Sequence, residues 1–198
     1  MVTERDYNMI NPVVTIKRSQ YTDNDFVLLI SHLDDELNNR HDNQRTVYDK
    51  FNKVDSIQTV IITHINDVPV GCGCFKQFDD NTVEIKRMFV ETAYRGKGIS
   101  KLILNELEKW AKELGYSRSI LETGIKLPEA IGLYEKSGYT RIINYGQYKD
   151  LPNSLCFEKI LIYLKILIHS QAAVAREAPK VRNFALSHLA QTGIKVFK

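Results

Sequence analysis

Residues 84–114 read E-I-K-R-M-F-V-E-T-A-Y-R-G-K-G-I-S-K-L-I-L-N-E-L-E-K-W-A-K-E-L, and they contain a strand, a glycine turn and a helix in succession. Alternation predicts a strand over residues 83–90 with two faces. One face would hold Val83, Ile85, Arg87 and Phe89, and the other Glu84, Lys86, Met88 and Val90. From Ile99 to Leu114 the apolar residues recur at the 3.6-residue spacing of a one-sided helix, which Gly115 then ends.

The turn between this strand and this helix has the sequence R-G-K-G-I-S over residues 95–100. Glycine adopts backbone dihedrals that other residues avoid, and it lets a ligand approach the backbone closely. The turn also lies where the unpaired N–H groups and the positive dipole end of the helix emerge. It therefore predicts an anion site for a phosphate or pyrophosphate, although it matches neither the nucleotide P-loop nor the dinucleotide fingerprint.

Two blocks of sequence resemble the GNAT superfamily of N-acetyltransferases, which depend on acetyl-coenzyme A (acetyl-CoA). Arg95, Gly98 and Ser100 occupy the three positions of R/Q-x-x-G-x-G/A, with Ser100 where the family has Gly or Ala. The second block is A-I-G-L-Y-E-K-S-G-Y at residues 130–139. The resemblance implies a mixed α/β, GNAT-like fold. Its central twisted sheet would be mostly antiparallel, with a V-shaped splay between two parallel strands and helices on its flanks.

The resemblance also implies acetyl-CoA as cosubstrate and no metal. Backbone groups of Met88, Phe89 and Val90 would bind the pantetheine arm and polarise the thioester carbonyl. The pyrophosphate would be held by Arg95, Gly96, Lys97, Gly98, Ile99 and Ser100. Lys97 or Lys101 would reach a further phosphate, with solvent-exposed charge as the equal alternative. Many relatives have Asn at the position of Leu127, so that one contact is expected to be missing here.

Two catalytic residues follow from the same resemblance. Tyr134 in the L-Y-E-K segment is the expected general acid, because a phenol with a pKa of about 10 can protonate a thiolate. The alternative is a core tyrosine. Glu84 is the expected general base, acting through an ordered water with a pKa raised by partial desolvation. The alternatives are a surface glutamate paired with Lys86 or Arg87, and Glu122 or water alone as the base.

The predicted function is therefore transfer of an acetyl group to a primary amine by direct attack. A non-catalytic acyl-CoA sensor or interaction module is the alternative, and a different acyl group also stays open. The acceptor would be a small-molecule or peptide amine. Acidic and aromatic residues that suit a cationic amine are expected to wall its site. They are Asp34, Asp35, Glu36, Tyr48, Tyr145 and Tyr148.

Composition predicts an ordinary globular chain of 198 residues, with 43% hydrophobic and 26% charged residues. We expect a flexible lead-in at 1–12, one catalytic domain at 13–160 and an extension of unknown role at 161–198. The tail from 162 holds six basic residues and one acidic residue, whereas the rest has 21 basic and 23 acidic residues. Such spaced charge does not favour nucleic acid. The apolar run at 160–168 is too short for a membrane and leaves a homodimer open.

Further elements follow from local patterns. Strands are expected at 13–17, 57–65, 68–78, 119–123, 139–142 and 154–159, and helices at 23–37, 44–53 and 128–138. Thr22 or Asp23 would cap the first helix. The three cysteines, Cys72, Cys74 and Cys156, form an odd set without disulfide or metal spacing. They predict buried small side chains in a cytoplasmic protein.

Overall fold

The computed structural model describes residues 12–40 and 56–161. Residues 1–11 of the expected lead-in, residues 162–198 of the expected extension and the expected helix at 44–53 lie outside these residues, whereas Leu161 is buried in the core. The elements are β1 (Val14–Ser19), α2 (Asn24–Arg40), β2 (Val60–Ile65), β3 (Val68–Gln77), β4 (Thr82–Val90), the 3-10 helix η1 (Thr92–Tyr94), α4 (Ile99–Glu113), β5 (Arg118–Gly124), α5 (Pro128–Lys136), β6 (Thr140–Ile142), the 3-10 helix η2 (Gly146–Tyr148) and β7 (Ser154–Ile160). No helix in this part of the chain is long and apolar enough to cross a membrane.

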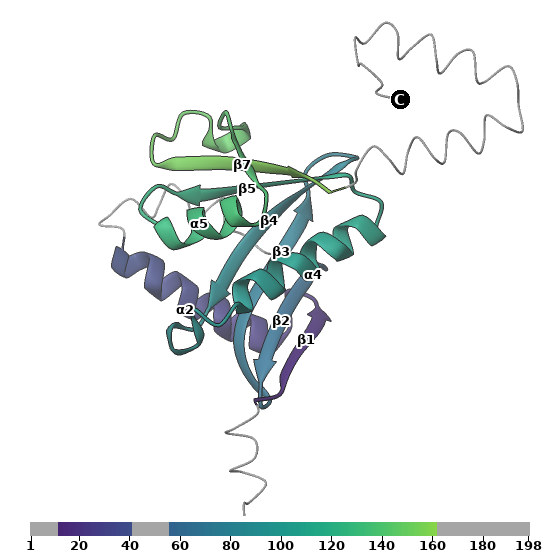
Figure 1. Cartoon of the computed structure of the whole chain (residues 1–198), viewed down its shortest axis with the longest axis vertical. Coiled ribbons are helices and arrows are strands. Elements are labelled where there is room, and N and C mark those ends of the chain that lie inside the picture. The colour runs from purple at the N-terminus through teal and green to yellow at the C-terminus, as the bar shows by residue number, and fades with distance from the viewer. Residues whose placement is uncertain (1–11, 41–55, 162–198) are drawn as a thin grey trace, which may run out of the picture. The chain divides into compact units, whose positions relative to one another are not determined.

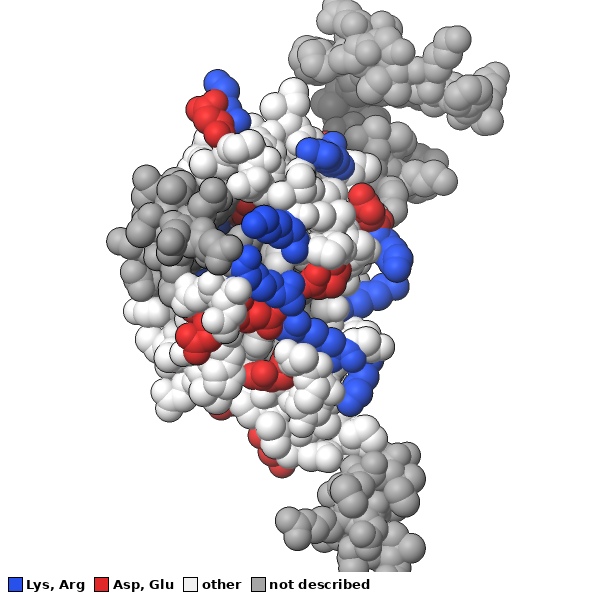
Figure 2. Space-filling view, turned by 90° about the vertical axis from the view of Figure 1, so that its left-hand side faces the viewer, with Lys and Arg blue, Asp and Glu red and all other residues white. Residues whose placement is uncertain are grey.

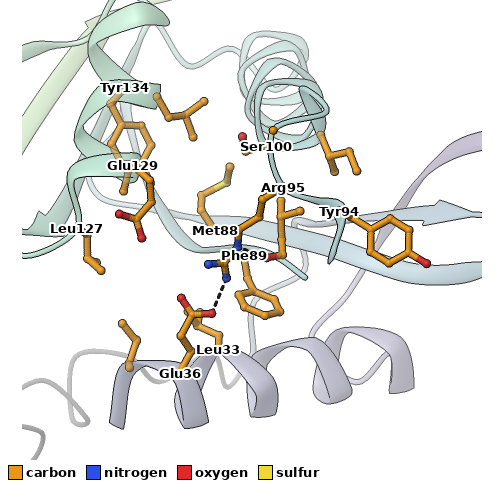
Figure 3. Close-up of a pocket in the computed structure, with 16 residues that line it drawn as sticks. Leu33, Glu36, Met88, Phe89, Tyr94, Arg95, Ser100, Leu127, Glu129 and Tyr134 are labelled. Carbon is orange, nitrogen blue, oxygen red and sulfur yellow. Dashed lines mark hydrogen bonds and ion pairs between the residues drawn. The ribbon is translucent and has the colours of Figure 1, made fainter. Parts of the chain in front are cut away.

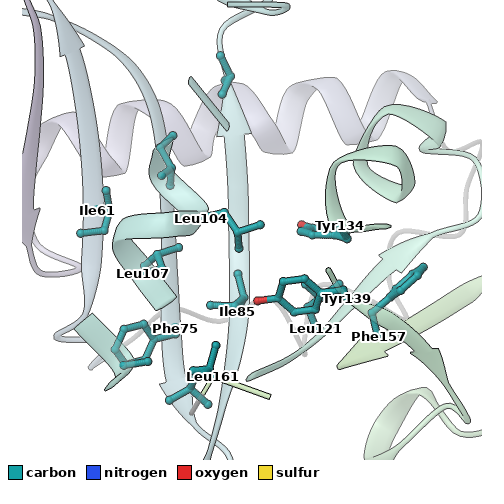
Figure 4. Packing of buried hydrophobic residues seen from close by; sticks show 14 of the residues in the cluster. Ile61, Phe75, Ile85, Leu104, Leu107, Leu121, Tyr134, Tyr139, Phe157 and Leu161 are labelled. Atoms are coloured by element: carbon teal, nitrogen blue, oxygen red, sulfur yellow. The ribbon is translucent and has the colours of Figure 1, made fainter. Parts of the chain in front are cut away.

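Seven strands form one sheet in the order β1-β2-β3-β4-β5-β7-β6. All neighbours are antiparallel except β4 and β5, which confirms the mostly antiparallel α/β fold (Figure 1). Helices α4 and α5 pack on one face through one apolar cluster, and α2 packs on the other through a second. Figure 4 shows Leu104 and Leu107 of α4 over the first of these clusters.

The parallel pair opens part-way along its length. β4 and β5 are in register only from Thr82 to Ile85 against Arg118 to Leu121. β5 then stays paired with β7 as far as Gly124, while β4 continues to Val90 beside β3. The two strands therefore diverge into the predicted V-shaped splay, and the backbone of β4 beyond Ile85 has no strand partner on this side.

The expected alternation along β4 is wrong after Ile85. The register with β3 shifts between Cys72 and Cys74, and Arg87 has a positive φ of 57°. One extra residue in a strand reverses the side-chain phase beyond it. Val83 and Ile85 therefore share the α4 face with Met88 and Val90, whereas Phe89 joins the α2 cluster.

The core explains two features of β3. Cys72 and Cys74 are free, fully buried and part of the α2 cluster, which confirms them as small core residues. Gly73 faces α4, and a Cβ placed there would lie 2.5 Å from the Met88 sulfur. The same Cβ would lie 3.0 Å from side-chain atoms of Ile103 and Leu107 of α4, so a larger residue at this position would force neighbouring side chains to shift.

Asp23 caps α2, and its loss should destabilise the protein in a pH-dependent way. Its carboxylate accepts hydrogen bonds from the Asp25 amide at 3.0 Å and from Lys17 at 2.7 Å, and also from Ser19. Burial opposes ionisation, but these bonds outweigh it and lower the Asp23 pKa to about 2. We expect Asp23→Ala to cost about 1 kcal/mol at pH 7.

The cost should shrink as the pH falls from about 4 toward 2, because the native carboxylate becomes protonated only there. Urea denaturation across that pH range measures it. Asp80→Ala, at an exposed carboxylate, is the control. A cost that stayed constant down to pH 2 would contradict the assignment.

Candidate active site

A pocket of about 280 Å³ lies at the splay, between the end of β4, the turn before α4, α5 and the C-terminal half of α2 (Figure 3). Seven of the nine predicted cofactor-binding residues line it. They are Met88, Phe89, Val90, Arg95, Gly96, Ile99 and Ser100. Lys97 and Gly98 belong to the same turn but do not line the pocket. The bulge and the divergence of two strands thus bring the strand end and the turn to one site.

The glycine turn leaves space and donors at the start of α4. Gly96 and Gly98 have φ values of 75° and 80°, and a Cβ at either would meet nothing within 4 Å. Gly98 is the N-cap of α4, and no side chain caps the helix there. No side chain of the described residues therefore accepts from the first N–H groups of α4, and an anion such as a diphosphate fits this arrangement.

Arg95 is occupied by protein groups. Its Nε donates to the Val90 carbonyl at 2.8 Å, and its guanidinium pairs with Glu36 of α2. The guanidinium also lies 5.8 Å from the centre of the Phe89 ring. Arg95 thus ties the turn to β4 and α2, so the uncapped backbone amides are the better donors for a phosphate.

Sequence reasoning missed two charged residues at this site: Glu129, which lines the pocket, and Arg40, which pairs with it. Arg40 pairs with Glu36 at 2.8 Å and also with Glu129, which joins the end of α2 to the start of α5. Basic side chains form a diagonal band, with acidic ones among them, on this side of the molecule (Figure 2). Glu129 and Leu127 both line the pocket. Of these two residues, only Leu127 could be singled out from the sequence, because many relatives have Asn at its position.

Tyr134 lines the pocket, as Figure 3 shows, and it is 5% exposed. Its ring packs against Tyr139 at 5.8 Å and Phe157 at 6.3 Å between centroids. Its hydroxyl has no hydrogen-bond partner among residues 12–40 and 56–161. Burial, with a smaller contribution from the charge of Glu122, raises the pKa of Tyr134. The phenol is therefore neutral at physiological pH and able to donate its proton.

Glu84 does not lie with Tyr134 on this pocket wall. It is 1% exposed, so the surface position in the alternative reading is wrong, whereas the pairing with Lys86 is present. The Tyr145 hydroxyl donates to Glu84 Oε1 at 3.1 Å. Lys76 Nζ lies 3.2 Å from Oε2 and Lys86 Nζ 3.6 Å from Oε1. Glu84 is thus held in a buried ionic cluster under Tyr145.

Other titratable groups share this cluster. Lys86 Nζ donates to the Tyr148 hydroxyl at 3.0 Å. Burial lowers the pKa of Lys86, and the charge of Glu84 opposes this shift. Burial raises the pKa of Glu122, and a hydrogen bond with Ser154 opposes it. Glu122, the substitute base, is therefore easier to protonate than an exposed glutamate.

The residues expected to wall the acceptor site are largely paired. Asp34 accepts two hydrogen bonds from Arg87, at 2.8 and 3.0 Å, and Glu36 pairs with Arg95. Tyr145 and Tyr148 bind Glu84 and Lys86. Tyr48 lies outside the described residues. Neutralised carboxylates attract a cation weakly, so the structure gives little support to a strongly cationic acceptor.

Several known proteins are similar to this chain in both sequence and fold. The model of the Acetyltransferase (GNAT) family matches residues 26–139, more than half of the chain. A relative named IAA acetyltransferase, from Azospirillum brasilense, is 31% identical over 158 residues, which cover 76% of this chain and 99% of the relative. The uncharacterised N-acetyltransferase YsnE of Bacillus subtilis is 34% identical over 97 residues, covering 48% of this chain and 64% of the relative.

Solved structures agree. A Klebsiella pneumoniae protein described as an acyl-CoA N-acyltransferase has a TM-score of 0.63 at 28% identity, covering 76% of this chain and 99% of its own. An acetyltransferase of the GNAT family from Staphylococcus aureus has a TM-score of 0.61 at 19% identity, covering 76% and 100%, which compares the fold alone. Because the family match spans the splayed strands, the glycine turn and Tyr134, this chain belongs to the GNAT family and is an acetyltransferase.

Proposed function

We propose that the protein transfers the acetyl group of acetyl-CoA to a primary amine, with the amine attacking the thioester directly. One observation carries the proposal: within the described residues, a single pocket brings together the end of β4 that is no longer paired with β5, the start of α4 without a side-chain cap and a Tyr134 hydroxyl without a hydrogen-bond partner. These groups match the parts of the cosubstrate in order. Strand amides suit the pantetheine arm, helix amides suit the diphosphate, and the phenol suits the sulfur.

The residues divide the chemistry between them. Backbone N–H groups near Met88, Phe89 and Val90 orient the thioester and stabilise negative charge on its oxygen. The amine nitrogen forms a bond to the carbonyl carbon, and the bond from that carbon to sulfur breaks. Tyr134 donates its proton to the departing thiolate, which leaves as the free thiol, and recovers a proton from solvent. The products are the N-acetylated acceptor and coenzyme A.

We propose Glu84 as the group that takes the proton of the amine. Its burial under Tyr145 supports relay through an ordered water rather than direct contact. Lys76 Nζ and Lys86 Nζ lie 3.2 and 3.6 Å from its carboxylate oxygens and hold the side chain in place. Glu122 is the second candidate, because it is buried in the same cluster and its pKa is raised.

The free, buried cysteines support a cytoplasmic location.

The expected diphosphate site is tested by Gly98→Ala. A side chain at Gly98 would enter the open space before α4 and strain a residue with φ of 80°. We expect the dissociation constant of acetyl-CoA to rise by at least about tenfold, the equivalent of one lost charge-assisted hydrogen bond. Isothermal titration calorimetry with acetyl-CoA measures it.

Gly115→Ala is the matched control. Gly115 has a φ of 93° and equal space, but it lies at the opposite end of α4. The control should lose similar stability and keep wild-type affinity. Equal affinity in the two variants would refute the site. The activity itself is tested by mass spectrometry of acetylated products over a panel of amines, with coenzyme A release measured in parallel.

A further inference from the structure

A second hollow, of about 1010 Å³, lies outside the catalytic pocket and shares no lining residue with it. It is formed by the start of β5, the turn before β4, β6 and the loop that carries η2. Ile120 places it on the sheet face opposite α4, since the next residue, Leu121, belongs to the α4 cluster. We call it the cationic hollow.

Its charge has one sign. Among the described residues, the lining includes Arg118, Arg141 and Lys149 and no Asp or Glu. Arg118 is paired with Glu158 at 2.6 Å. The Arg141 guanidinium and the Lys149 ammonium have no ionic or hydrogen-bonded side-chain partner in the part of the chain that the structure describes. Two uncompensated cations therefore remain at the hollow.

Several large apolar side chains that line the hollow are exposed to solvent. Ile143 is 91% exposed and Phe78 is 43% exposed, and both line the hollow beside Ile142 and Pro152. Exposed large apolar side chains that gather in a concave surface are typical of a binding site. The Phe78 ring meets the Tyr145 ring edge-on at 5.3 Å, which gives the hollow an aromatic wall.

We propose that the cationic hollow binds an organic carboxylate with an aromatic or branched apolar body. The carboxylate would pair with Arg141, whose planar guanidinium matches it with two parallel hydrogen bonds, while Lys149 adds a second positive charge. The apolar body would cover Ile143 and Phe78. Tyr145 connects the hollow to the buried Glu84 cluster, because it lines the hollow and its hydroxyl donates to Glu84. A bound ligand therefore contacts the residue that covers the proposed base.

The test uses the full chain with isoleucine methyl groups labelled for NMR, and phenylbutyrate as the probe. Phenylbutylamine, which has a similar body and the opposite charge, is the comparison. Phenylbutyrate should shift the methyl signals of Ile142 and Ile143 in a saturable way and leave Ile16, on β1, unmoved. The amine should bind at least about fivefold more weakly, as expected when two partly exposed ion pairs are replaced by repulsion.

The double variant Arg141→Gln/Lys149→Gln should weaken phenylbutyrate binding by about fivefold or more. Lys109→Gln/Lys112→Gln removes the same charge from the exposed side of α4 and should leave binding unchanged. Equal binding of the two probes, equal loss in both double variants, or shifts caused by an acidic peptide but not by phenylbutyrate would overturn the proposal. Because the readout needs neither acetyl-CoA nor turnover, its failure is distinct from failure of the proposed acetyl transfer.

Discussion

Replacement of Tyr134 by phenylalanine is expected to lower kcat for acetyl transfer by about 10²- to 10⁴-fold, the usual contribution of a positioned general acid. The ring fills the same space in both proteins, so packing against Tyr139 and Phe157 is retained. The lost hydroxyl has no protein partner in the described part of the chain, so its removal leaves no buried group unsatisfied. Affinity for acetyl-CoA should therefore stay within about twofold.

Tyr139→Phe is the control for this experiment. Tyr139 is 3% exposed and packs beside Tyr134, but its hydroxyl bonds to Ser119 Oγ at 2.9 Å and does not line the pocket. That variant should lose stability of about 1 kcal/mol and keep its kcat. Steady-state kinetics with the best amine of the panel, together with calorimetry, separate the two. Unchanged turnover in Tyr134→Phe would remove the phenol from the mechanism.

Replacement of Glu84 by glutamine has the second large expected effect, and it acts on two quantities. Turnover should fall by about 10²-fold or more, because glutamine cannot accept the proton of the amine. The free energy of unfolding should also fall, by about 3 kcal/mol, because Lys86 is left buried without its carboxylate. Urea denaturation measures the second effect, and kinetics normalised to folded protein measure the first.

Glu108→Gln separates catalysis from stability. Glu108 is 5% exposed and its Oε2 accepts from Lys159 at 2.6 Å, so it is also a buried carboxylate paired with a lysine, away from the pocket. Its loss should destabilise the protein, by less than the loss of Glu84 because the Lys159 side chain is 24% exposed, and should leave turnover unchanged. Glu122→Gln tests the second candidate base. Wild-type turnover and pH dependence in Glu84→Gln, with only its stability reduced, would assign Glu84 a structural role alone.

Local chemistry made the strand, the turn and the helix around Gly98 predictable. Positive φ values at Gly96 and Gly98 are available to glycine at low cost, and the helix after them follows from its apolar spacing. The Tyr134 segment was equally readable through its resemblance to a known family. The family and the general activity therefore followed from residues 84–139, which are close in sequence.

Long-range packing decided the rest. The side-chain phase of β4 depends on a bulge at Arg87 that forms against β3, so strict alternation placed Met88 and Phe89 on the wrong faces. Glu84 accepts a hydrogen bond from Tyr145, which lies 61 residues away, and two residues that line the pocket, Glu36 and Glu129, are joined through Arg40.

The sequence by itself determined the family, the anion-binding turn and the candidate acid, because each rests on backbone propensity or on a short motif. Only the tertiary structure decided which carboxylates are buried and paired. It also placed two cations, which lack a side-chain partner among residues 12–40 and 56–161, beside exposed apolar side chains at the cationic hollow. Burial and ion pairing are set by segments that are distant in the chain and close in space, and local sequence does not encode which of those segments will meet.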